Sequence, residues 1–343
     1  MFQPPRCPNR KCPRHRDPTP RFFVKKGFYR PRCRPRPIPR FRCRTCGRGF
    51  SRQTFRVDYR DHRPDLNASL FLSIASGVGL RQTARNLQLT RRSTELKFRK
   101  LARHLRRLNL NVCGPLPPGS ELQFDELETY EGRRNTRPLS VAILIERKTR
   151  FVIWAESATI RPRGRMSEAR KEAILQDERR SGPRRDNSRR AVQRTLARGA
   201  PLVAGLQRVV FQTDEKSTYP GLAAEAFGAS RLVHQTTPSG LPRWTWNPLF
   251  AINHTEAMLR DLTGRLRRES WLVTKRRRYL DLGLQLAMAY RNLVRRRFNH
   301  DKESAAQLAG FLKRRLTPGE VLGWRQDWGK GRSIHPTSSS RAS

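Results

Sequence analysis

The sequence has few acidic residues for its size. It contains 28 Asp and Glu against 73 Lys and Arg in 343 residues, a formal net charge of +45. An excess this large indicates a polyanionic partner, of which nucleic acid is the commonest. A ribosomal or packaging protein that uses its charge only for general attraction is the simpler alternative.

Long apolar runs are also scarce. The longest nearly apolar run covers residues 70–80 and is interrupted by Ser and Gly, which makes it too short and too polar to span a bilayer. The first residues contain no apolar stretch either, so we expect no signal peptide, no membrane partner and a cytoplasmic, nucleoid-associated protein. Apolar runs at 139–145, 151–155 and 209–211 nevertheless argue against full disorder.

The six cysteines point to metal binding, because a cytoplasmic protein keeps its thiols reduced. Cys7 and Cys12 form one close pair, and Cys43 and Cys46 form another about 30 residues later. With strands expected at 21–29 and 40–42, these pairs predict a structural zinc ribbon over residues 1–58. A Pro-rich region this short depends on metal to fold.

Some alternatives remain open for the zinc ligands. Cys33 could replace Cys12, and His15 is a weaker candidate. Gly47 allows the tight turn after the second pair, and Phe50 is expected to pack beneath it.

Residues 59–110 predict a helix-turn-helix domain. Helices are expected at 66–75, 80–87 and 91–108, with a turn at 88–89 and Thr90 as the N-cap of the third helix. Leu96, Leu101 and Leu105 give this helix an apolar stripe. Its exposed faces are expected to carry cations that can contact DNA in the major groove, namely Arg91, Arg92, Lys97, Arg99 and Lys100. The alternative is a plain three-helix bundle with a solvated basic face.

The next region contains a cluster of acids. Four carboxylates fall within residues 121–128, a segment that suits a strand. Strands at 138–146 and 151–155, a helix near 188–198 and a strand at 207–214 follow. This order predicts an α/β ribonuclease H-like core over residues 111–300, in which the first and fourth strands are neighbours.

That arrangement would bring Asp125 and Asp214 together at one sheet edge. Two carboxylates so close repel each other unless a cation lies between them. Mg²⁺ or Mn²⁺ held there could serve phosphodiester chemistry. Alternatively, these acids are solvated or pair with arginines.

A helix that begins near Pro248 offers a third site residue. Asn253, Glu256 and Arg260 are spaced i, i+3 and i+7, so all three share one face. Chemistry alone favours Glu256, since an anionic ligand holds Mg²⁺ better than a neutral amide. The alternative is that Asn253 caps a helix turn while Glu256 pairs with Arg260.

Several motifs occur together in a familiar order. They are Cys-x₂-Cys-Gly-x₂-Phe-Ser from Cys43, Asp125-Glu-x₃-Tyr-x-Gly, Thr-Asp214-Glu with Tyr219, Asn253-His-Thr, and the block from Arg265 to Lys275. With this order the chain resembles insertion-sequence transposases of the DDE type, with an N-terminal zinc ribbon and helix-turn-helix, and in particular the insertion-sequence-one-like transposases. The resemblance implies cleavage and joining of double-stranded DNA at element ends and in a target, dependence on Mg²⁺ or Mn²⁺, and a homo-oligomer assembled on DNA. It also favours Asn253 as the third active-site position, with Arg260 seven residues later.

The chain departs from the family in three places, one of which is the interval between Asp214 and Asn253, where Trp244, Trp246 and several prolines indicate a loop over the site. Glu128 stands where the family often has an aromatic residue, and the Arg-rich stretch 161–201 is expected to be an insertion. Residues 301–343 are expected to form a C-terminal helix and a disordered tail.

Two other functions compete with a transposase. One is a zinc-ribbon and helix-turn-helix DNA-binding regulator, or an inactive transposase remnant, without catalysis. The other is a basic RNA-binding protein. The facing carboxylates favour the transposase, because a pure binder gains nothing from them in a chain of charge +45.

Overall fold

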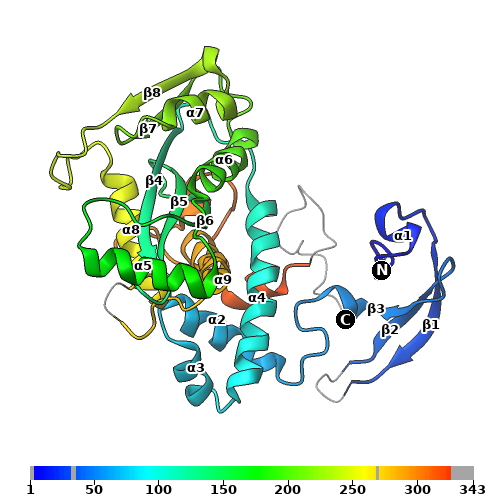
Figure 1. Ribbon diagram of the computed structural model, residues 1–343. Helices are drawn as coiled ribbons and strands as arrows, with labels where there is room; N and C mark the ends of the chain where they lie inside the picture. The colour runs from blue at the N-terminus through cyan, green and yellow to red at the C-terminus, as the bar shows by residue number, and fades with distance from the viewer. Residues whose placement is uncertain (1–3, 32–35, 268–269, 326–343) are drawn as a thin grey trace.

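The computed structural model describes residues 4–31, 36–267 and 270–325 of a mixed α/β protein. An N-terminal antiparallel sheet is followed by three helices and then by a larger mixed sheet with helices on both faces (Figure 1). In the described residues, no helix is both long enough and apolar enough to cross a membrane.

The N-terminal part is held by a small antiparallel sheet in the order β1-β2-β3. Its core is a cluster of rings from Phe22, Phe41, Phe50 and Phe55, so Phe50 packs as expected. The elements are α1 (Pro13–Arg16), β1 (Phe23–Tyr29), β2 (Ile38–Cys43) and β3 (Gly49–Ser51).

Three helices follow, close to the expected bounds. They are α2 (Asn67–Ala75), α3 (Leu80–Asn86) and α4 (Arg91–Val112). The turn before α4 forms at Gln88, whose φ is +50°. Thr90 caps α4, since its side chain accepts a hydrogen bond of 3.1 Å from the Ser93 amide.

The buried face of α4 differs from the expected stripe. Leu96 is 55% exposed, whereas Leu101 and Leu105 are buried as expected and share the buried face with Phe98 and Leu108. Lys97 was expected on an exposed face, but it is only 8% exposed, so that prediction is wrong. Its ammonium forms an ion pair with Asp61 and donates to the side chain of Asn67 at 2.9 Å, which supports the buried charge.

The larger sheet has five strands in the order β6-β5-β4-β7-β8. The first three strands pair antiparallel, whereas β4 pairs parallel with β7, and β7 with β8. The strands are β4 (Glu121–Tyr130), β5 (Pro138–Glu146), β6 (Val152–Thr159), β7 (Val209–Thr213) and β8 (Leu232–Thr236).

Helices cover both faces of this sheet because its strands are apolar on both sides. Leu144 and Phe124 pack with helices α6 and α7, whereas Val141 and Ile143 pack with α8 and α9. The helices of this region are α5 (Glu168–Ser181), α6 (Ser188–Gly199), α7 (Tyr219–Phe227), α8 (Phe250–Leu262) and α9 (Arg277–Ala289).

The Arg-rich stretch 161–201, which was expected to be an insertion, contains two helices that differ in burial. Helix α5 has no buried residue. Helix α6 instead belongs to the core, because Ala191, Val192 and Leu196 are buried against the sheet. The arginines of α6 occupy its opposite, exposed face. Their number makes the segment look polar overall, although one face of the helix is apolar.

The chain then returns to the three-helix region. Two short helices, α10 (Ala305–Leu308) and α11 (Pro318–Gly323), end the described part, and Val321 and Trp324 join the main core. The tail expected to be disordered, residues 334–343, lies outside the described residues.

His104 fastens α11 to α4. Its Nε2 donates to the Val321 carbonyl at 3.1 Å, and its ring meets Trp324 edge-on. Burial lowers the pKa of His104 from 6.5 to about 4, although the hydrogen bond to Val321 acts in the opposite direction.

This shift predicts a pH-dependent stability. The neutral ring is favoured in the folded state, so its contribution is complete above pH 6.5 and is lost as the pH falls towards 4. We expect wild type to lose about 3 kcal/mol more than His104→Phe between pH 7 and pH 4, measured by denaturant unfolding. Equal losses in the two proteins would contradict the buried neutral histidine.

Candidate functional site

Four cysteines meet at one point in the N-terminal part. The Sγ atoms of Cys7 and Cys46 are 3.5 Å apart, and those of Cys12 and Cys43 are 3.9 Å apart. All four Sγ atoms lie within 4.8 Å of one another. A zinc tetrahedron with bonds of about 2.3 Å has edges of about 3.8 Å, so these four thiols could bind one zinc ion.

Local backbone structure positions the thiols. Cys43 ends β2, and Gly47 closes the following turn with φ +71° and an amide that donates to the Cys43 carbonyl. Cys12 precedes α1 directly, and the Cys7 amide donates to the Arg14 carbonyl at 3.0 Å. Each tight turn brings the two cysteines of one pair together, which requires the short spacing between them.

The two weaker zinc candidates have different outcomes. His15 is outside the group of four, and its Nδ1 lies 2.7 Å from the Cys7 carbonyl oxygen. Cys33 lies outside the described residues. Cys113 is remote from the cluster, at the end of α4, where its Sγ donates to the Asn109 carbonyl.

The thiols of the cluster differ in acidity. Burial raises the pKa of Cys7. Burial acts the same way on Cys46, but hydrogen bonds from the Arg48 backbone and the neighbouring thiols lower its pKa to about 7. Metal binding requires the thiolate form, and the lowered pKa of Cys46 favours that form.

A second group of polar residues lines a cavity of about 280 Å³ beside the large sheet. The walls come from β4, from the segment after β7 and from α8. Asp125, Glu126, Glu128, Asp214, Asn253, Glu256 and Arg260 all line it, with Arg243. We call this cavity the carboxylate pocket. It brings together every residue expected in the carboxylate site.

Strand pairing sets the positions of the two aspartates. Gln123 of β4 is paired with Gln212 of the parallel strand β7. Asp125 follows two residues later within β4, and Asp214 follows two residues later directly after β7. Parallel strands have their carboxyl ends at the same edge, which is where ligands bind in open α/β sheets. The two carboxylates therefore face one site.

Gln123 fixes α8 against this edge, a role that the sequence did not reveal. Its fully buried side chain donates to Gln212 Oε1 and to the Pro248 carbonyl, both at 2.7 Å. Its own oxygen accepts a hydrogen bond of 2.9 Å from the Ile252 amide. One side chain thus holds the first turn of α8 beside β4, one residue before Asn253.

The environment of Asp125 is unusual for an acid in a basic protein. Burial raises the pKa of Asp125 to about 6, and the charge of Asp214 acts in the same direction. The Glu126 amide, which donates to Asp125 at 2.7 Å, and the charge of Arg243 oppose this rise. Proximity of two like charges is the arrangement that a bound cation would relieve.

Glu126, the next residue, is engaged differently. Its carboxylate pairs with Lys216 and accepts hydrogen bonds from Tyr219 at 2.9 Å and Ser140 at 2.7 Å. Three partners leave this acid well satisfied, so it joins β4 to β5 and to the start of α7. The sequence could not show this, because Lys216 and Tyr219 are about 90 residues away.

The candidates on α8 remain two. Asn253 is half-buried, Glu256 is 4% exposed, and both line the carboxylate pocket. Arg260 lines it too, and its guanidinium lies 3.5 Å from the Glu128 carbonyl oxygen. The spacing i, i+3, i+7 therefore places three side chains in one pocket, as the sequence predicted, without choosing between Asn253 and Glu256.

The cations expected on the exposed faces of α4 differ in how exposed they are. Arg91 and Arg92 are exposed at its first turn. Arg99 is half-buried and lies 3.9 Å from Glu95. Lys100 donates to the Tyr59 carbonyl, and burial lowers its pKa. With Lys97 buried, only the first-turn arginines keep the full exposure expected of groove contacts.

No known family model and no curated protein matches the sequence. A function must therefore come from the chemistry of the side chains themselves.

The cysteine geometry predicts one zinc per chain. We expect Cys43→Ser to lose the metal and the fold of residues 1–58, because three thiolates no longer complete the tetrahedron. Cys113→Ser, which removes a thiol remote from the cluster, should retain the zinc. Elemental analysis of the purified proteins measures this directly. Wild-type protein without zinc, or equal zinc in Cys43→Ser, would contradict the assignment.

Proposed function

We propose that this chain is a DNA transposase of the DDE type, which binds the ends of its element, cleaves DNA strands and transfers them to a target. One observation carries the proposal. Asp125 and Asp214 line one pocket with two further candidate ligands, Asn253 and Glu256, on a helix held in place by Gln123.

The strand order supports the same function. Three antiparallel strands, a helix and then a parallel strand beside the first are the order expected of a ribonuclease H-like core. In that order the acid within the first strand and the acid after the fourth converge, which is the relation between Asp125 and Asp214.

The donors of the carboxylate pocket suit a hard divalent cation. Carboxylate and amide oxygens are the ligands preferred by Mg²⁺, and Mn²⁺ accepts the same set. Asp125 and Asp214 would hold the metal, with Asn253 or Glu256 as the third ligand. When bound, the metal would polarise the scissile phosphate and activate the attacking hydroxyl.

Other side chains of the pocket suit a nucleic-acid substrate. Arg243 and Arg260 also line the pocket and would contact phosphate groups of the substrate. Trp244 and Trp246 are 59% and 72% exposed and form an edge-to-face pair in the segment that lines the pocket. Exposed rings of this kind stack with bases.

The remaining parts of the chain would supply DNA binding. Helices α2, α3 and α4 would act as the helix-turn-helix, with Arg91 and Arg92 at the start of the helix that enters the major groove. The cysteine cluster would hold a structural zinc. Action on two element ends would require more than one copy of the chain.

Removal of either aspartate should abolish cleavage. We expect Asp125→Asn and Asp214→Asn to lower Mg²⁺-dependent cleavage at least about 100-fold, because a lost metal ligand costs several kcal/mol of transition-state stabilisation. DNA binding should be unchanged or slightly tighter, since each change removes a negative charge. The substrates are duplexes made from the DNA that flanks the gene.

Glu225→Gln is a matched control, because it removes an exposed acid of α7 that does not line the pocket. It should keep activity within about tenfold of wild type, a difference of about 1.4 kcal/mol. Cleavage within the same range for either aspartate variant would exclude that residue as a metal ligand. Specific DNA binding without cleavage by wild type would instead support a DNA-binding regulator.

Two further variants decide the third ligand. If Asn253 holds the metal, Asn253→Ala loses cleavage and Glu256→Gln keeps most of it, because Glu256 then contributes only charge. If Glu256→Gln alone abolishes cleavage, the site is a triad of three acids. We expect the first outcome, measured with the same duplexes under the same Mg²⁺ concentration.

A further inference from the structure

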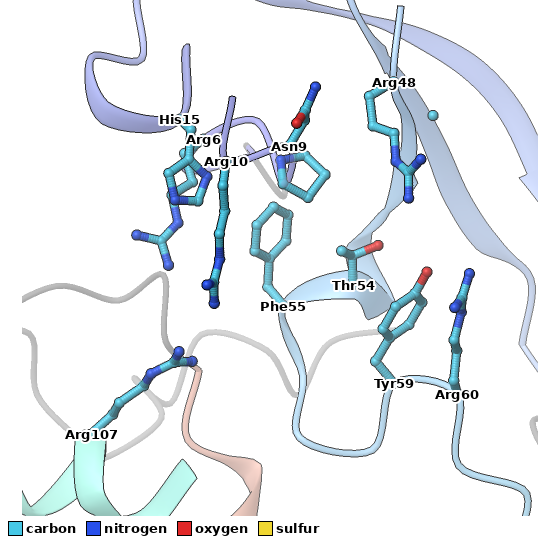
Figure 2. A pocket seen from close by; sticks show the side chains of 12 residues that line it. Arg6, Asn9, Arg10, His15, Arg48, Thr54, Phe55, Tyr59, Arg60 and Arg107 are labelled. Carbon is cyan, nitrogen blue, oxygen red and sulfur yellow. The ribbon is translucent and has the colours of Figure 1, made fainter. Parts of the chain in front are cut away.

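A cleft of about 610 Å³ lies between the cysteine-rich part and helix α4. Its walls come from the loop that holds Cys7 and Cys12, from the turn between β2 and β3 with the segment that follows β3, and from the C-terminal half of α4 (Figure 2). We call it the ribbon cleft. It shares no described lining residue with the carboxylate pocket.

The ribbon cleft is lined by arginines from separate parts of the sequence. Arg6, Arg10, Arg48, Arg60 and Arg107 all contribute, and its described lining residues include no aspartate or glutamate. Figure 2 shows Arg10 and Arg107 extending towards the same gap from opposite walls. Asn9 and Thr54 add uncharged hydrogen-bonding groups.

These positive charges are brought together against their repulsion. The pKa of Arg107 is lowered by burial and then by the charges of Arg6, Arg10 and Arg103. A bound anion would turn this repulsion into attraction.

The rings beside the cleft favour phosphate over base as the bound group. Phe55 is 8% exposed and packs edge-on against Phe50, so it offers little surface for stacking. The ring of Tyr59 is covered by the Arg60 guanidinium at 5.4 Å. Guanidinium groups bind phosphate oxygens through two parallel hydrogen bonds.

We propose that the ribbon cleft binds the sugar–phosphate backbone of duplex DNA and extends the contact made by helix α4. The inference rests on the proposed function, in which α4 enters the major groove. Arg107 follows Arg91 by 16 residues, which is about 24 Å along the helix axis, or about seven base pairs of duplex. A single duplex is long enough to reach both ends of α4.

Salt dependence of binding tests this inference. The variant Arg6→Gln/Arg10→Gln/Arg107→Gln is compared with wild type on a 30-base-pair duplex from the flanking DNA, over a series of KCl concentrations. Each lost phosphate contact lowers the magnitude of the negative slope of log K against log salt by about 0.9. The magnitude should therefore decrease by about 2.7 in this variant. Zinc content and circular dichroism establish that the variant remains folded.

Two control variants separate a local contact from general charge. Arg6→Lys/Arg10→Lys/Arg107→Lys keeps the charge and should restore most of the slope. Arg179→Gln/Arg180→Gln/Arg190→Gln removes three exposed arginines of α5 and α6 and should lower the slope by less than about one. Equal losses in the two Gln variants would overturn the proposal.

A free anion is the other outcome. Calorimetric titration with inorganic phosphate that shows tight binding, together with an unchanged DNA slope in the first variant, would assign the cleft to a small anion and overturn the proposal. Cleavage is not measured in either experiment. A chain that binds DNA as expected but does not cleave it would refute the transposase and leave the ribbon cleft assigned.

Discussion

The short parallel pairing of β4 with β7 determines where the acids of this protein lie. Only three residue pairs join the two strands, from Glu121 with Val210 to Gln123 with Gln212. Beyond them β7 ends at Thr213 while β4 continues to Tyr130 beside β5, so Asp125 within β4 and Asp214 just after β7 line the same pocket. The Gln123 side chain extends the same contact to α8 through Pro248 and Ile252.

The net positive charge of the chain makes the proximity of Asp125 and Asp214 unusual. Several acids form ion pairs, as Asp61 does with Lys97 and Glu320 with Arg314, and within the pocket Glu126 pairs with Lys216. Asp125 instead lies near another carboxylate although arginine is abundant. In a protein of charge +45, a site that keeps two acids together is best explained by a cation that both can hold.

Local patterns allowed much of the structure to be predicted from the sequence. The cysteine spacings, Thr90 at the start of α4 and the apolar runs of the strands depend on neighbours in the chain, and the structure agrees with each. The spacing on α8 predicted that Asn253 and Glu256 share a face, but two residues one turn apart have equal access to the same pocket. Periodicity alone cannot choose between them.

Contacts between distant residues set the limits of that prediction. Lys97 is a basic residue of the kind that contacts DNA, yet its buried ammonium pairs with Asp61 and Asn67. The roles of Gln123, Lys216 and Tyr219 depend on partners far along the chain. The ribbon cleft joins arginines that are about 100 residues apart, and no local pattern marks them among 61 arginines.

The central claim is that the carboxylate pocket holds a divalent metal ion. It is tested most directly by titration of Mn²⁺ into the zinc-loaded, full-length protein, followed by electron paramagnetic resonance. The account predicts saturable Mn²⁺ binding in wild type that weakens at least about tenfold when Asp125 and Asp214 are both replaced by Asn, with zinc retained. Binding of the same strength in the doubly substituted protein, or no binding in wild type, would contradict it.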